Sequence, residues 1–431
     1  MLALFRILAL FLSVLLATST TALATPLSAW GSQLPWPQNA SFELERTPLV
    51  DDVVHYRTEL QVGPGEFDRI ALHRIVRETA PFRPIKSREA LFLAHGANVG
   101  LEGTFLTSLE IEEADPTLNL PVYLAQRGVD VWGLDFRWVL VPPETEDLTF
   151  METWDLAMEV RDLKVAIGAA RWIRTLTGSG FRKIDLLGFS RGGRIAYAYL
   201  NEETQIPPGL RHVDRYISLD HPFKSVDEAD SAAACALVER LQSQIDSGNL
   251  AQDIRAVGLL GSLALEQPDA PSPFFTGLKN RQAALTLAAL PPGGTDTFHA
   301  FAGFFEGAVP TGLRHTAEGT AFNLFASSAS YLPRTSSRDL QAIACNETPS
   351  EFDDHLDEIT VPVFYLGAAG GNAEAGLDTF PFLGSRLLDS QIIRFLPPGQ
   401  ELLDVGHADL LTMESARELV WRPILDWVTA R

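Results

Sequence analysis

Basic residues are scarce in this chain of 431 residues. Lysine and arginine together number 34, against 55 aspartates and glutamates, so the formal net charge is −21 at neutral pH. Nucleic acids and anionic membrane surfaces attract basic proteins. The charge therefore argues against both as partners, and a hydrated acidic surface is its simplest interpretation.

Long apolar runs are equally rare. Beyond the N-terminal region no stretch is long and apolar enough to cross a bilayer, which takes about 20 residues. At the N-terminus, Arg6 precedes an apolar run over 7–17, and Ala22-Leu23-Ala24 offers the small residues of a cleavage site. This pattern predicts a signal peptide over residues 1–24, cut after Ala24, and a secreted or periplasmic protein. The alternative is a membrane anchor, for which the run is only about half long enough.

Cysteine is limited to two residues, Cys235 and Cys345. In an exported protein an even number permits a disulfide. We expect these two cysteines to be bridged, which would stabilise the fold by up to about 4–5 kcal/mol on chain-entropy grounds. Two buried, unpaired thiols are the alternative.

The usual patterns of metal and phosphate sites are also missing. No closely spaced set of histidines and cysteines occurs, and the glycine-rich run over 367–371 is not followed by the lysine of a phosphate-binding loop. We therefore expect no metal and no cofactor.

What the sequence does contain is an alternation of strand and helix patterns. Short apolar runs typical of buried parallel strands recur along the chain, with helical stripes between several of them. The alternation predicts an α/β fold, in which a mostly parallel sheet carries helices on both faces. Residues 25–50 have the composition of an irregular lead-in. The strand patterns cover 53–62, 69–78, 90–94, 129–133, 184–188, 216–219, 361–366 and 392–396, and helical patterns begin at 156, just after 190 and at about 413.

One long segment interrupts the alternation. Residues 222–351 separate two predicted strands by far more than an ordinary connection. They are rich in Ala, Leu and Phe, which argues against a disordered linker. We interpret them as a mostly helical cap, or lid, inserted into a core of residues 25–221 and 352–431. Its phenylalanines form either the cap's own core or an apolar lid over a substrate; they are Phe274, Phe275, Phe298, Phe301, Phe304, Phe305, Phe322 and Phe325.

The strongest functional signal is Gly188-Phe189-Ser190-Arg191-Gly192. It lies between a predicted strand and a predicted helix, which is the context of a nucleophile elbow. Small residues on either side let the serine hydroxyl project from a sharp turn, and the first N–H groups of the helix face developing negative charge. Ser190 is therefore the candidate nucleophile. The backbone N–H groups of Arg191 and Ala97 are the candidate oxyanion-hole donors.

A nucleophilic serine needs a base and an acid. Among nine histidines, His407 fits best, because it follows the last predicted strand by a short loop and precedes the terminal helix. His95, at the end of a strand, is better explained as a structural residue. The acid remains open. Asp220 ends the strand before the cap, whereas Glu374 and then Asp378 are the first carboxylates after strand 361–366.

Four segments resemble the acid-lipase branch of the α/β hydrolases, to which the gastric and lysosomal lipases belong. They are Leu91-Phe92-Leu93-Ala94-His95-Gly96, Leu124-Ala125-Gln126-Arg127-Gly128-Val129-Asp130-Val131-Trp132, Gly188-Phe189-Ser190-Arg191-Gly192 and Gly406-His407-Ala408-Asp409. The resemblance covers roughly residues 85–221 and 355–430, and not the cap. The motifs are specific for the superfamily and only moderately so for the branch.

This resemblance implies an α/β-hydrolase fold and a Ser-His-acid triad without a metal. It also implies hydrolysis of small-molecule or lipid-like carboxylic esters under a mobile cap. The chain departs from the family at the acid, which the family places directly after the strand corresponding to 361–366. The same triad could instead serve an amide, thioester or polyester hydrolase. A catalytically silent binding protein would be expected to have lost the serine or the histidine, and both are present.

Overall fold

The computed structural model describes residues 44–110, 117–292, 297–346 and 350–430, so the predicted signal peptide lies outside the described residues. A ten-stranded sheet forms the centre of this part of the chain. Its strands are β1 (Leu44–Val50), β2 (Val53–Gln61), β3 (Arg69–Ala80), β4 (Arg83–Pro84), β5 (Ala90–Ala94), β6 (Asp130–Asp135), β7 (Ile184–Phe189), β8 (Val213–Leu219), β13 (Val363–Ala368) and β14 (Leu388–Ile393). The strand order is β1-β2-β3-β6-β5-β7-β8-β13-β14, with β4 paired to β3.

The larger part of this sheet is parallel. From β6 to β14 neighbouring strands run in the same direction, whereas β1, β2 and β3 form an antiparallel meander that joins β6. Parallel strands are buried on both faces. In β5, Phe92 and Ala94 belong to the apolar core on one face of the sheet, and Leu91 and Leu93 belong to the core on the other.

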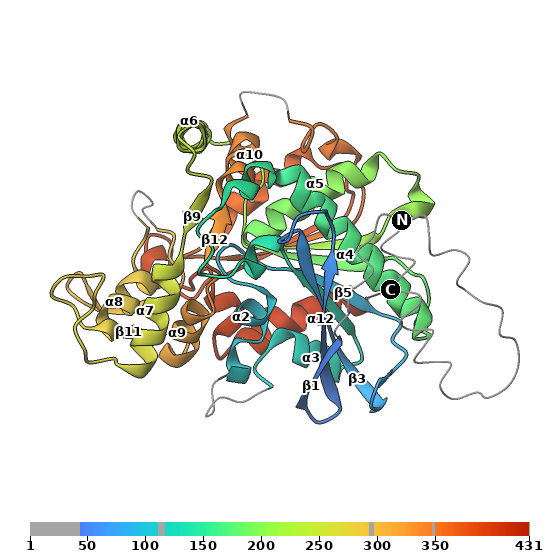
Figure 1. The fold of residues 1–431 in the computed structure, drawn as a ribbon, viewed down its shortest axis with the longest axis horizontal. Helices are drawn as coiled ribbons and strands as arrows, with labels where there is room; N and C mark the ends of the chain where they lie inside the picture. The colour runs from blue at the N-terminus through green and yellow to red at the C-terminus, as the bar shows by residue number, and fades with distance from the viewer. Residues whose placement is uncertain (1–43, 111–116, 293–296, 347–349, 431) are drawn as a thin grey trace, which may run out of the picture.

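Helices cover both faces of the sheet (Figure 1), which confirms the predicted α/β architecture. Helices α4 (Leu156–Leu176) and α5 (Arg191–Thr204) lie on one side. Helices α3 (Leu120–Gln126) and α12 (Arg422–Thr429) lie on the other. Helix α4 begins where the Asp155 side chain accepts a hydrogen bond of 2.9 Å from the Met158 N–H, which satisfies one of its free amides.

The predicted elements differ from the observed ones mainly at the edge strands of the sheet and in the C-terminal helix. Residues 44–50 form strand β1 rather than an irregular lead-in, and β14 begins at Leu388 rather than at 392. The terminal helix predicted from about 413 corresponds to a π-helical turn η9 (Arg417–Trp421) and α12, and the short helix α11 (Asp409–Thr412) precedes it. Pro423 explains the π-turn, because its ring has no N–H to donate and would clash with the carbonyl four residues earlier.

The segment between β8 and β13 contains helices and two small sheets. In Figure 1, α7, α8 and α9 cluster at one end of the molecule, and α6 lies beside α10. None of the helices in the described ranges is long and apolar enough to cross a membrane. The elements are α6 (Glu228–Asp246), α7 (Arg255–Glu266), α8 (Asn280–Ala289), α9 (Glu318–Ala326), α10 (Arg334–Cys345), and the strand pairs β9 (Ala251–Asp253) with β12 (Tyr331–Pro333) and β10 (Gly303–Glu306) with β11 (Val309–Leu313).

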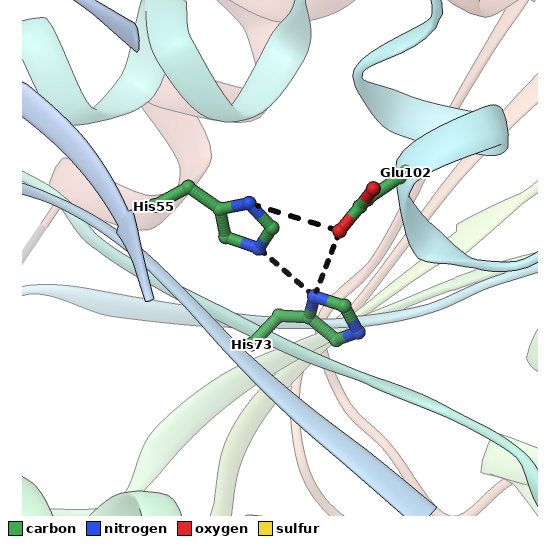
Figure 2. A group of neighbouring side chains, drawn as sticks. All are labelled: His55, His73 and Glu102. Atoms are coloured by element: carbon green, nitrogen blue, oxygen red, sulfur yellow. Dashed lines mark hydrogen bonds and ion pairs between the residues drawn. The ribbon is translucent and has the colours of Figure 1, made fainter. Parts of the chain in front are cut away.

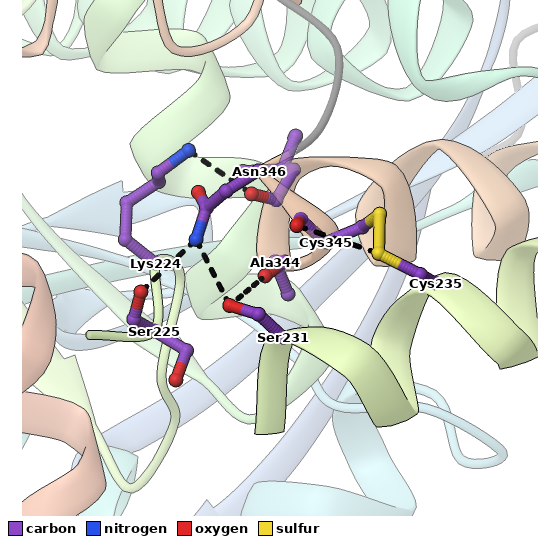
Figure 3. Close-up of a disulfide and its surroundings, with 8 residues drawn as sticks. Lys224, Ser225, Ser231, Cys235, Ala344, Cys345 and Asn346 are labelled. Atoms are coloured by element: carbon purple, nitrogen blue, oxygen red, sulfur yellow. Dashed lines mark hydrogen bonds between the residues drawn. A yellow bond between two sulfur atoms is a disulfide. The ribbon is translucent and has the colours of Figure 1, made fainter. Parts of the chain in front are cut away.

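The predicted disulfide is present, since Cys235 of α6 is bonded to Cys345 at the end of α10 (Figure 3). Hydrogen bonds surround it. The Asn346 side-chain amide donates to the carbonyl of Ser225 at 3.0 Å and to the hydroxyl of Ser231 at 3.2 Å. The bridge and these bonds together attach the first turns of α6 to the end of α10.

Candidate active site

Ser190 occupies the sharp turn between β7 and α5. Its backbone angles are φ 53° and ψ −125°, a conformation that costs a residue with a side chain about 1–3 kcal/mol. The turn packs tightly against the end of β5. A Cβ atom on Gly192 would collide with the backbone oxygens of Ala94 and His95, so a glycine is required there. The serine itself is partly exposed.

His407 lies in the loop between β14 and α11, and its imidazole is held by a carboxylate. Its Nδ1 is 2.5 Å from Oδ2 of Asp220, which directly follows β8 and is fully buried. The Asp220 carboxylate also accepts the N–H groups of Ala368 at 2.8 Å and Asn372 at 3.1 Å. A carboxylate at Nδ1 fixes the tautomer in which Nε2 carries the free lone pair.

The other two carboxylates that the sequence left open lie in different surroundings. Glu374 is exposed and forms an ion pair of 2.8 Å with Arg394. Asp378 accepts a hydrogen bond of 3.2 Å from the N–H of Val226. Of the three carboxylates, all within the described residues, Asp220 is the one that lies against His407.

The loop after β5 runs beside the serine. A Cβ atom placed on Gly96 would lie 3.2 Å from the Cβ of Ser190. Ala97 is the next residue along this loop. The carbonyl of Asn98 accepts a hydrogen bond of 2.6 Å from the N–H of Ala329, so the segment between β8 and β13 holds this loop. The Arg191 amide belongs to the first turn of α5 and therefore has no acceptor within that helix.

His95 shapes the same loop. It is completely buried, its Nε2 accepts the N–H of Phe136 at 3.3 Å, and its Nδ1 lies 2.8 Å from the carbonyl of Gly96. The backbone donor at Nε2 leaves the ring proton on Nδ1, where it bonds that carbonyl. Burial lowers the pKa of His95, which keeps the ring neutral. These contacts are those of a structural residue.

The side chain of Arg191 connects the elbow to two distant helices. Its guanidinium donates to both oxygens of Glu159 in α4 at 3.0 Å and to the hydroxyl of Ser336 in α10 at 2.5 Å. Burial raises the pKa of Glu159, and the positive charge of Arg191 opposes that rise. This role could not be predicted from the sequence, because the residue after the serine varies freely in the elbow pattern.

Segment 299–302 of the insertion runs alongside the histidine loop. The N–H of His407 donates to the carbonyl of His299 at 2.9 Å. Oδ2 of Asp409, two residues further along, accepts the N–H of Ala302 at 2.8 Å. Backbone of the insertion therefore holds the loop that carries the imidazole.

Aromatic rings enclose the imidazole of His407. The ring of Phe189 stacks on it with centroids 4.6 Å apart, and the ring of Phe298 lies at 5.2 Å. The cap phenylalanines divide into different roles, since Phe301, Phe322 and Phe325 are buried in the insertion's own core. Phe298 is the member of that set in ring contact with His407.

Comparison with known proteins supports the fold. No protein-family model and no curated protein sequence matches this chain. A solved structure from Sulfolobus solfataricus, described as a candidate lipase, aligns over 90% of this chain and 99% of its own length, with 19% identity and a TM-score of 0.62. The chain has the α/β-hydrolase fold.

Two further structures with this α/β-hydrolase similarity are more remote. A soluble variant of monoglyceride lipase from Saccharomyces cerevisiae covers 92% of this chain and 98% of its own, with 12% identity and a TM-score of 0.48. An esterase from Thermogutta terrifontis covers 87% and 98%, with 14% identity and a TM-score of 0.41. The fold assignment depends on the Sulfolobus structure, and at these identities the similarity extends to the fold alone.

Proposed function

We propose that this α/β-hydrolase is a secreted serine hydrolase that cleaves carboxylic esters. Ser190 is the nucleophile, His407 the general base and Asp220 the acid. The observation that carries the proposal is the 2.5 Å contact between Nδ1 of His407 and Oδ2 of the buried Asp220. Hydrolysis by a serine nucleophile requires a buried carboxylate oriented toward an imidazole. It also requires a serine on a strained turn between a strand and a helix, as in this fold.

Each group then has one task. Nε2 of His407 takes the proton of Ser190 as the hydroxyl oxygen attacks the ester carbonyl, and Asp220 stabilises the imidazolium that forms. The N–H groups of Arg191 and Ala97 hold the negative oxygen of the tetrahedral intermediate. The alcohol leaves with the proton from His407, and water releases the acyl group by the same route.

The finer assignments depend on further observations. Phe189 and Phe298 line the imidazole with apolar surface, which favours an apolar acyl or alcohol group and a lipid-like ester. The N-terminal pattern supports secretion, and so does the disulfide, because disulfides persist in oxidising compartments. The four sequence segments favour the acid-lipase branch, although an acid at Asp220 departs from the position that this family uses.

The test is covalent labelling with a fluorophosphonate probe, together with turnover of p-nitrophenyl esters of increasing chain length. An activated serine attacks phosphorus as it attacks a carbonyl, so we expect labelling of the wild type and none of Ser190→Ala. Ser243→Ala, at an exposed serine of α6, is the matched control and should label normally. Undiminished labelling of Ser190→Ala would contradict the assignment.

The alternatives give different results in the same assays. An amide, thioester or polyester hydrolase would label at Ser190 but would prefer those substrates over simple esters. A catalytically silent binding protein would neither label nor turn over any of them.

A further inference from the structure

A second cluster of polar side chains lies on strands β2 and β3, outside the proposed triad. His55 of β2, His73 of β3 and Glu102 of α2 (Leu101–Phe105) point toward one another (Figure 2). Nε2 of His55 is 2.9 Å from Nδ1 of His73. Oε1 of Glu102 is 3.8 Å from Nδ1 of His55 and 3.9 Å from Nδ1 of His73.

The hairpin register explains why the two histidines meet. In the antiparallel pair β2–β3, His55 is opposite Ile75 and His73 is opposite Arg57. Residues offset by two positions lie on the same face of a sheet as diagonal neighbours. The two rings are nearly parallel, with an angle of 11° and centroids 5.1 Å apart. The first turn of α2 places Glu102 over this face.

A buried carboxylate sets the tautomer of His73. Nε2 of His73 is 3.0 Å from Oδ2 of Asp135, whose other oxygen accepts the N–H of Leu101 at 2.7 Å. The carboxylate acts as the acceptor, so the proton of His73 resides on Nε2 and the lone pair of Nδ1 faces His55 and Glu102. Histidines that bind metals are oriented by a carboxylate in this way.

We propose that His55, His73 and Glu102 bind a divalent transition-metal ion of the zinc class. Two imidazoles and one carboxylate are a ligand set that Zn²⁺ takes in sites with an open fourth position. The distances from Nδ1 of His73 to Nε2 of His55, 2.9 Å, and to Oε1 of Glu102, 3.9 Å, lie on either side of the roughly 3.4 Å expected between ligands about 2.1 Å from a tetrahedral ion. Calcium and magnesium favour oxygen ligands, so the imidazole pair selects against them.

Binding requires one rearrangement of protons. In the metal-free chain the Nε2–H of His55 donates to the lone pair of His73 Nδ1. When the ion binds, the proton of His55 moves to Nδ1 of the same ring, and both facing nitrogens present lone pairs to the ion. Both rings stay neutral and no proton is lost.

A cleft gives the ion a route to the cluster. Glu102 and Asp135 line a cleft of about 460 Å³, whose other walls include residues of α9. The side chain of Glu102 is 47% exposed, whereas the rings of both histidines are buried. The ion would therefore be bound from the cleft side and keep water as its fourth ligand.

One positive charge borders the same cleft. Arg57 lines it, and a free guanidinium there would disfavour a cation. Arg57 is paired, however, with Glu59 at 2.9 Å and with Glu45 at 3.3 Å. These two carboxylates offset its charge.

The location suggests what the ion does. Helix α2 begins directly after the loop that carries Ala97, so an ion on Glu102 would attach this loop to β2 and β3. This positioning role rests on the proposed function, because it concerns the oxyanion donor. Metal binding itself does not, so Ser190→Ala should bind Zn²⁺ as the wild type does.

The experiment uses the full chain with its affinity tag removed and its metals stripped by a chelator. Calorimetric titration should show one Zn²⁺ bound per chain, and Co²⁺ should give the visible absorption of a four-coordinate site. We expect Glu102→Gln and His55→Gln to weaken Zn²⁺ binding by at least tenfold, since even groups that only orient ligands contribute about 10–100-fold. Zn²⁺ should raise the melting temperature of the wild type and not that of Glu102→Gln.

Glu228→Gln is the matched control, because Glu228 is also an exposed glutamate in the first turn of a helix. It should bind Zn²⁺ as the wild type does. Glu102 is partly exposed, so its variant should fold even if His55→Gln does not. Absence of Zn²⁺ binding in the wild type, or equal binding by the wild type and Glu102→Gln, would overturn the site.

Discussion

Asp220 is fully buried and accepts hydrogen bonds from the imidazole of His407 and from the N–H groups of Ala368 and Asn372. A buried charge without partners would be very unfavourable, and these donors offset the cost of its desolvation. The same contacts fix the direction in which the carboxylate points. The residue therefore combines a structural and an orienting task.

We expect Asp220→Asn to lower the turnover of an ester substrate by up to about 10⁴-fold, because an amide favours the wrong tautomer of His407. Glu374→Gln should stay within about tenfold of the wild type, because Glu374 is exposed and paired with Arg394. The measurement is kcat on a p-nitrophenyl ester, with circular dichroism to verify folding. The reverse pattern would identify Glu374 as the acid.

Buried histidines predict the response of stability to pH. Burial lowers the pKa of His221 to about 3 and that of His212 to about 4, whereas both titrate near 6.5 in the unfolded chain. Between these values the unfolded state binds more protons, so the free energy of unfolding should fall as the pH decreases from about 6.5 toward 3. Urea unfolding at a series of pH values measures this slope.

His212→Gln provides the comparison for that slope. It should reduce the proton uptake on unfolding at about pH 5 by nearly one proton, because the folded protein leaves His212 neutral there. An unchanged slope would show that His212 is already protonated in the folded state.

Some residues of the proposed site can be predicted from the sequence and others cannot, for physical reasons. Ser190 can be proposed from the sequence because the sharp turn imposes small neighbours that leave a local pattern. The sequence does not decide between Asp220 and Glu374 as the acid, because they follow β8 and β13, which are adjacent in the sheet. Only the three-dimensional packing shows which carboxylate lies against the histidine. His55 and His73 could have been paired from the hairpin register, since both strands were predicted.

Among the elements, strands buried on both faces were the easiest to predict. The predicted strand 90–94 coincides with β5 and 184–188 nearly coincides with β7, because their continuous apolar runs follow from double burial. Edge strands β1 and β14 consist mainly of exposed and half-buried positions and lack such runs. The residues at which β1 and β14 begin and end depend on pairing with neighbouring strands, and a local sequence pattern holds no information about that pairing.

Helix α6 is held mainly from one side. Its buried side chains are Ala234 and Leu241, and it packs against α10, to which the disulfide joins it. We expect the double variant Cys235→Ser/Cys345→Ser to lose up to about 4–5 kcal/mol in the free energy of unfolding. Amide hydrogen exchange should accelerate most in α6.

The control for this prediction is a reductant, which should destabilise the wild type and leave the double variant unchanged. Equal acceleration of exchange along the whole chain would contradict a local anchoring role for the bridge.

At the scale of the whole molecule, the insertion and the core are joined at the proposed site. The insertion contacts the histidine loop through segment 299–302 and the loop after β5 through Ala329, and Ser336 contacts the side chain of Arg191. The sequence resemblance implied a mobile cap. In this structure, segment 299–302 and Ala329 are instead hydrogen-bonded to the histidine loop and to the loop after β5.

Gly406→Ala tests this coupling. A Cβ atom there would lie 2.6 Å from the carbonyl oxygen of Ala300, so the two segments must separate and move His407 with them. We expect turnover to fall by about 10–100-fold, since a displacement of about 1 Å can cost 100-fold. Gly209→Ala, where a Cβ would meet nothing, is the control and should behave as the wild type. Equal kinetics for both variants would show that the contact is unimportant.

The backbone bonds between segment 299–302 and the loop of His407 also limit how this protein can be re-engineered. A chimaera that exchanges the insertion for that of another hydrolase would remove the support of His407, the proposed general base, and we expect it to be inactive for a reason unrelated to specificity. Directed evolution should therefore retain the native segment 299–302 and randomise the surroundings of Phe298, where new side chains can change the apolar surface beside the imidazole without detaching it.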